Sequence, residues 1–149
     1  VTCMDGLGVV DALLEVATTS RVDAECIAAR RSAVQALTPA ARRGDERALQ
    51  VLVSSLQDWP ASVRNAALDA LAEVATKGDR RVVYARLTAI RALAPLAASG
   101  NKRALDAIVA GLKDQHISVR EGAMEELAKI ASNGDGVNGG ELSARLSAV

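Results

Sequence analysis

The only histidine of the chain, His116, is the first candidate for chemistry, because imidazole transfers protons and binds metal ions near neutral pH. Both roles need converging partners, and no cluster of His, Cys and carboxylate residues surrounds it in the sequence. We interpret His116 as an exposed turn residue. Walker-type phosphate loops, Gly-x-Ser-x-Gly and dinucleotide fingerprints are also missing from the sequence. The sequence therefore predicts a non-enzyme with no catalytic residue, no metal site and no cofactor.

The two cysteines, Cys3 and Cys26, are too few for a disulfide framework and form no Cys-x-x-Cys pair. A reducing intracellular compartment is therefore favoured. An organelle stays open as an alternative, because the chain starts at Val1 without an initiator Met and a targeting segment can already have been removed. The apolar runs are short and interrupted by charge, so no membrane span is predicted.

Charge and composition argue for packed helices that do not capture polyanions. The chain has 18 Lys and Arg against 18 Asp and Glu, and one Trp, one Tyr and no Phe. Zero net charge and two aromatic residues disfavour nucleic-acid binding. Three arginines, Arg64, Arg86 and Arg120, could be taken as a basic stripe for phosphates. For Arg64 and Arg120 we favour a structural role, since each follows a matching turn aspartate, Asp58 or Asp114.

Internal repetition is the strongest signal in the sequence. The tract 30–85 is written again at about 86–141 after a shift of 56 positions, which brings Arg30 onto Arg86 and Asp58 onto Asp114. A unit that cannot bury its apolar face alone must stack on its neighbours, which makes a solenoid. We therefore expect 1–149 to be a single all-α repeat array, opened and closed by partial repeats.

Apolar residues recur at helical spacing through most of the chain, and no strand-like alternation is sustained. The expected helices number about eight, near 7–18, 24–42, 46–57, 62–77, 81–98, 102–113, 118–132 and 142–149. The shortened segment 79–85 stands where a full first helix of a repeat is expected. Prolines inside two helices, Pro39 and Pro95, occupy matching places and predict a bend in each.

Glycine followed by Asp or Asn marks the helix ends, at Gly44, Gly78, Gly100 and Gly134. Such a glycine adopts the left-handed conformation that ends a helix, and the next side chain caps the following helix. The expected caps are Asp45, Asp79, Asn101 and Asp135. The same recurrence explains the adhesion-like tripeptide Arg43-Gly44-Asp45, which we interpret as repeat punctuation.

The sequences Asp58-Trp-Pro-Ala-Ser-Val63-Arg64 and Asp114-Gln-His-Ile-Ser-Val119-Arg120 resemble the inter-helix turn of HEAT repeats, and the resemblance covers the whole chain. It implies a right-handed solenoid in which the turn aspartates and the arginines form a ladder between neighbouring repeats. The wording Leu-x-x-Val-Ala-x-x-Gly-Asp is similar to the phycobilin-lyase subgroup. The shortened segment 79–85 instead suggests three-helix, armadillo-like units.

Trp59 is the candidate for partner binding, because its counterpart in the second copy is Gln115 and the repeat does not require an aromatic residue there. Tryptophan is enriched at binding hot spots. The alternative is that Trp59 packs on Pro60. Tyr84 is interpreted as a packing residue.

The sequence favours a non-catalytic scaffold or accessory subunit whose partners are other protein subunits, with no small-molecule substrate and no nucleic acid. Two alternatives stay open. One is a bilin-handling protein similar to phycobilin lyases, and the other is a nucleic-acid-binding module.

Overall fold

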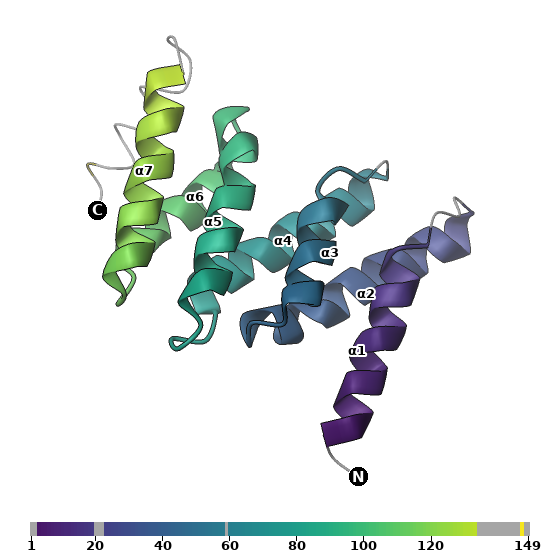
Figure 1. Cartoon of the computed structure of the whole chain (residues 1–149). Helices are drawn as coiled ribbons and strands as arrows, with labels where there is room; N and C mark the ends of the chain where they lie inside the picture. Colours follow the sequence, from purple (N-terminus) through teal and green to yellow (C-terminus); the bar gives the residue numbers. More distant parts are fainter. Residues whose placement is uncertain (1–2, 20–22, 59, 134–146, 148–149) are drawn as a thin grey trace.

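The chain is all-α in a computed structural model that describes residues 3–19, 23–58, 60–133 and 147 (Figure 1). Those residues form seven helices and no strand. The helices are α1 (Cys3–Ala17), α2 (Ala24–Arg42), α3 (Glu46–Ser55), α4 (Ala61–Lys77), α5 (Val83–Ala98), α6 (Lys102–Gly111) and α7 (Ile117–Asn133). The eighth expected helix, at 142–149, lies outside the described residues apart from Ser147.

The starts of three helices follow from capping side chains. The Asp23 carboxylate accepts a hydrogen bond from the Cys26 N–H at 2.9 Å and opens α2. Asp45 caps α3 through the N–H groups of Arg47 and Ala48, and Asn101 caps α6 through Ala104. Each cap satisfies N–H groups that have no partner inside the helix. The predicted roles of Asp45 and Asn101 are therefore visible in the local hydrogen bonding.

Glycine follows the ends of α2, α5 and α4, and it adopts the expected conformation after the first two only. Gly44 and Gly100 have φ of 93° and 95°, the left-handed region that favours glycine. Gly78 has φ of −60° and ψ of 156°, so the expectation of a left-handed residue is wrong there. Its need is steric, because a Cβ would lie 2.5 Å from the Val74 carbonyl oxygen and 3.0 Å from Cγ of Arg86. A close approach, and not a turn conformation, requires this glycine.

The two internal prolines do not break their helices. Pro39 lies in α2 and Pro95 in α5, and each helix continues for three residues beyond its proline. The backbone carbonyls of both prolines still accept hydrogen bonds, from Arg43 N–H at 3.2 Å and Ser99 N–H at 3.1 Å. Proline placed close to a C-terminal end removes one backbone donor without disturbing the following turns.

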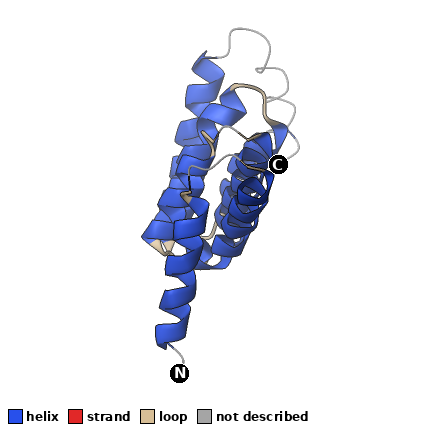
Figure 2. Cartoon of the chain, turned by 90° about the vertical axis from the view of Figure 1, so that its right-hand side faces the viewer, coloured by secondary structure: helices blue, strands red, loops and turns tan. Residues whose placement is uncertain are grey.

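The helices form two layers, seen face-on in Figure 1 and edge-on in Figure 2. One layer contains α1, α3, α5 and α7, and the other contains α2, α4 and α6. Neighbours within each layer are in contact, and so are successive helices across the layers. The core between the layers is aliphatic, and its largest fully buried side chains include Leu37, Leu52, Leu71, Ile90, Leu93 and Ile108. Many alanines lie beside them, which allows the helices to approach closely.

The two sequence copies correspond to two successive groups of three helices, α2–α4 and α5–α7. Helices α3 and α6, and likewise α4 and α7, begin and end at positions that differ by the same 56 residues. Helices α2 and α5 also end in register, but α5 begins three residues later than its counterpart. Because each copy has an odd number of helices, corresponding helices lie in opposite layers (Figure 1).

Candidate functional site

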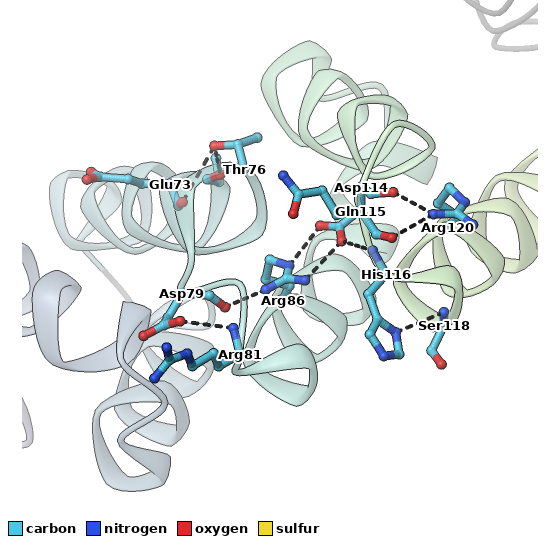
Figure 3. A network of polar contacts seen from close by, with 11 residues as sticks. Glu73, Thr76, Asp79, Arg81, Arg86, Asp114, Gln115, His116, Ser118 and Arg120 are labelled. Carbon is cyan, nitrogen blue, oxygen red and sulfur yellow. Dashed lines mark hydrogen bonds and ion pairs between the residues drawn. The ribbon is translucent and has the colours of Figure 1, made fainter.

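The buried arginine Arg86 joins α5 to the α4–α5 loop and to the turn between α6 and α7 (Figure 3). Arg86 of α5 is 3% exposed, and its Nε and Nη2 donate to the two carboxylate oxygens of Asp114 at 2.7 and 2.9 Å. Its Nη1 donates to the Asp79 carbonyl oxygen in the α4–α5 loop. We call this arrangement the second corner. A bidentate arginine–carboxylate pair is among the strongest side-chain contacts in proteins, and burial makes the loss of either partner costly.

The Asp114 carboxylate has a further donor, the His116 N–H at 2.8 Å. Partial burial disfavours its charged form, but the hydrogen bonds from Arg86 and His116 and the charge of Arg86 outweigh this and lower the pKa of Asp114. Arg120 completes the corner from α7, because its guanidinium donates to the Asp114 carbonyl oxygen at 2.8 Å. Asp114 thus stays ionised and organises the turn between α6 and α7.

The first corner has the same plan, but among the described residues its buried arginine makes fewer bonds. Arg30 of α2 is 6% exposed and its Nη2 donates to the Asp58 carboxylate, while Arg64 donates to the Asp58 carbonyl oxygen at 2.7 Å. The Nε of Arg30 is buried without a hydrogen-bond partner. Proline at position 60 has no N–H to offer where His116 provides one in the second corner.

The turn aspartates and the predicted arginines are therefore close together, but the contacts differ from those expected. Arg64 and Arg120 hold the backbone carbonyls of Asp58 and Asp114, and the carboxylates are held by Arg30 and Arg86. The sequence carried a signal for this: both pairs have an arginine within a helical apolar pattern, 28 positions before the aspartate. Only the matching of both copies at that spacing could have found it.

Asp79 does not cap a helix. Its carboxylate accepts from the Arg81 N–H at 2.9 Å within a turn, and α5 begins at Val83 after Val82, which makes no side-chain cap. The segment 79–82 is therefore a loop. The Asp79 N–H donates to the carbonyl oxygen of Arg42 at 2.9 Å, which ties this loop to the end of α2.

The remaining sequence candidates are distributed as follows. Trp59 and Asp135 lie outside the described residues. His116 is exposed, and its Nδ1 accepts a hydrogen bond from the Ser118 N–H at 3.2 Å in the turn before α7. Tyr84 is partly exposed and its hydroxyl donates to the Gly44 carbonyl oxygen. Burial, with the nearby charges of Glu46 and Asp45, raises the pKa of Tyr84.

An open groove of about 630 Å³ runs across the layer formed by α2, α4 and α6. Small side chains make its floor, among them Ala66, Ala70 and Ala107, and leave room between the helices. Exposed polar and charged side chains make its rim, namely Gln35, Asp69, Lys77, Arg103 and Asp106, with Glu73 half-buried. We call this feature the α2–α4–α6 groove.

Two ion pairs fix the rim of the α2–α4–α6 groove. Arg103 of α6 lies 2.9 Å from the Asp69 carboxylate of α4, and Arg42 of α2 lies 3.2 Å from the Glu73 carboxylate. Arg42 Nε also donates to the carbonyl oxygen of Lys77 at 3.1 Å. Exposed pairs of this kind add little stability. They set the charge pattern that a molecule lying in the groove would meet.

The part of the chain that the structure describes holds no group of three or more His, Cys, Asp or Glu side chains able to bind a metal ion together. None of the described helices is both long enough and apolar enough to cross a bilayer.

No protein-family model and no curated protein matches the sequence. Among solved structures, the chain is similar to a crystal structure of an engineered protein, at 23% sequence identity and a TM-score of 0.40. That alignment covers 93% of this chain and 67% of the other. At this TM-score the likeness supports no conclusion about family or activity.

Proposed function

We propose that this chain is a non-catalytic protein-binding module, a HEAT-like right-handed solenoid that serves as a scaffold or accessory subunit. The α2–α4–α6 groove is the proposed binding surface, and a segment of another protein is the proposed ligand. The proposal rests on one observation: three neighbouring helices of one layer, α2, α4 and α6, combine a floor of alanines with a rim of charged side chains.

The shape of the α2–α4–α6 groove suits a peptide segment. Enclosed, mostly apolar pockets with convergent polar groups are typical of small-molecule sites. This groove is open along its length, and its polar groups are spread over three helices. A segment that lays small side chains on Ala66, Ala70 and Ala107 could pair with the rim charges on both sides, as in helix-in-groove recognition.

Site-specific cross-linking tests this proposal directly. A photoreactive amino acid at Gln35, on the groove rim, should capture a partner from an extract of the native source. The matched control carries it at Glu121, an exposed residue of α7 in the other layer. Capture of the same proteins at both positions, or at neither, would contradict binding in the groove.

A charge exchange separates recognition from folding. The double variant Asp69→Arg with Arg103→Asp keeps an ion pair but reverses its direction across the groove. Stability should change by less than about 0.5 kcal/mol, as is usual for exposed residues, while cross-linking from Gln35 should be lost. Undiminished cross-linking would show that the rim charges do not select the partner.

A further inference from the structure

A second hollow lies beside the α2–α4–α6 groove and differs from it in charge. It has a volume of about 390 Å³ and lies at the C-terminal ends of α4 and α6, next to the α4–α5 loop. Thr76 and Lys77 line both hollows. The other side chains of this notch include Arg80, Arg86, Lys113, Asp114 and Gln115.

The notch gathers unpaired positive charge. Lys77, Arg80 and Lys113 are exposed, and none of them forms an ion pair among the described residues. The single carboxylate in the lining, Asp114, is already held by Arg86 through two hydrogen bonds. The local excess of cations therefore stands out in a chain whose net charge is zero.

Three different segments supply these cations. Lys77 closes α4, Arg80 lies in the following loop, and Lys113 follows α6. With its amide turned to satisfy hydrogen bonding, the Gln115 oxygen lies 3.3 Å from the Arg80 guanidinium, which gives this arginine a neutral partner. The carbonyl ends of the two helices favour positive charge and allow the cations to lie near each other.

The first copy shows that the fold does not need this charge. Gln57 stands at the position of Lys113, in the same kind of turn after the corresponding helix. Ala24, the first residue of α2, stands 56 positions before Arg80, so the first corner has no arginine at this position. Lys113 and Arg80 thus have no basic counterpart 56 positions earlier, and the first corner forms without them.

We propose that this notch binds a phosphate monoester. Lysines act as point charges for phosphate oxygens and arginine donates to two of them, and cations arriving from three segments suit a tetrahedral group better than a planar carboxylate. The volume exceeds that of one oxyanion, so the organic group that carries the phosphate also has room. This inference does not depend on the proposed function.

The test is an NMR titration of the full chain, labelled with ¹⁵N, against inorganic phosphate at constant ionic strength balanced with sodium chloride. Amide signals of residues 77–80 and 113–115 should shift and saturate, with a dissociation constant on the order of 1 mM. Shifts that never saturate, or that spread over exposed cations elsewhere such as Arg31, would overturn the proposal.

Three variants assign the binding to the notch. Lys113→Gln installs the residue of the first copy and should weaken phosphate binding roughly fivefold, and adding Arg80→Ala should bring the loss to more than about tenfold. Arg31→Gln removes an exposed cation of α2 and should leave binding unchanged. Helical circular dichroism checks the fold, and Lys113→Gln alone decides the matter if the double variant unfolds. Wild-type affinity in Lys113→Gln would overturn the proposal.

The carrier of the phosphate is identified by comparing O-phosphoserine with a phosphoserine heptapeptide of neutral flanking sequence. Tighter binding of the peptide would assign the notch to phosphorylated protein segments, and equal binding would assign it to small phosphorylated molecules. Either result supports the phosphate site. Failure of both compounds to displace inorganic phosphate would overturn it.

Discussion

The first and second corners contain the same residue types, but the buried arginine of the second corner is more completely hydrogen-bonded. In the second corner, the guanidinium of Arg86 binds both carboxylate oxygens of Asp114 and one backbone carbonyl. In the first corner, Arg30 binds Asp58 through one nitrogen and leaves its Nε buried without a partner. A buried polar atom without a partner costs free energy. The internal repeat therefore preserves the arginine–aspartate pair, while the residues next to the pair determine how much stability it contributes.

The largest expected effect is the difference between two alanine variants. Asp114→Ala should lower the free energy of unfolding by about 3 kcal/mol, because it leaves the Arg86 cation buried and unpaired. Asp58→Ala also leaves a buried cation, Arg30, without its carboxylate, but it breaks one hydrogen bond where Asp114→Ala breaks two, so it should cost less, about 2 kcal/mol. Urea unfolding measures both, with Glu121→Ala as an exposed control. Equal losses of unfolding free energy would show that the two corners contribute equally to stability.

Gly78→Ala should cost about 2 kcal/mol through overpacking, because the new Cβ would meet the Val74 carbonyl oxygen and Cγ of Arg86. The counterpart of Gly78 in the second copy is Gly134, so the sequence repeat keeps glycine at this position. The measurement is again urea unfolding, with Gly8→Ala as control, since no atom lies within 4 Å of a Cβ there. A neutral Gly78→Ala would mean that both the Val74 carbonyl and the Arg86 side chain move aside without loss of stability.

Replacing His116 by proline gives the second corner the residue that the first corner has at the matching position, Pro60. The variant loses the N–H that donates to Asp114 and should be less stable than His116→Ala by about 1 kcal/mol. The alanine variant keeps the N–H, so the difference isolates the backbone bond. A carboxyl ¹³C titration should also show the pKa of Asp114 rising. Identical stabilities of the two variants would show that the backbone hydrogen bond to Asp114 adds no stability.

The smallest expected effect is on pH dependence. The pKa of Asp114 is lowered in the folded state, so its contribution to stability is present above the unfolded-state pKa of about 3.9 and is lost as the pH falls through the folded-state value. Wild type should therefore lose more stability than Asp114→Asn between about pH 6 and pH 3. Urea midpoints at both pH values give the comparison, with Glu121→Gln as control. Parallel losses would remove Asp114 as a source of acid sensitivity.

Sequence reasoning succeeded where local chemistry is decisive. The bounds of α2 at 24–42 follow from the Asp23 cap and the last apolar residues before Gly44, and they agree with the expected helix. The start of α3 after Asp45 is equally local. Both depend on interactions between residues a few positions apart, which the sequence displays directly.

The failures lie where distant segments meet. Gly78 was expected to adopt a left-handed conformation, but its constraint comes from two close contacts, one with the Val74 carbonyl oxygen and one with Arg86, a side chain of the next helix. The turn aspartates were expected to form a ladder with arginines such as Arg64 and Arg120, but their carboxylates bind arginines that lie 28 positions before each aspartate. The α2–α4–α6 groove depends on which alanines face outward after three helices have packed. No local pattern contains that information.

The odd number of helices in each copy has a consequence for any array made from this unit. In a two-layer stack, each copy begins in the layer opposite to that of the copy before it, as α2 and α5 do (Figure 1). On one side of the array, the same helix of the unit then recurs only in every second copy. A helix-pair unit would instead keep every duplicated surface on one side. Duplication of a three-helix unit therefore places corresponding helix faces on alternating sides of an array, whereas their sequences stay alike.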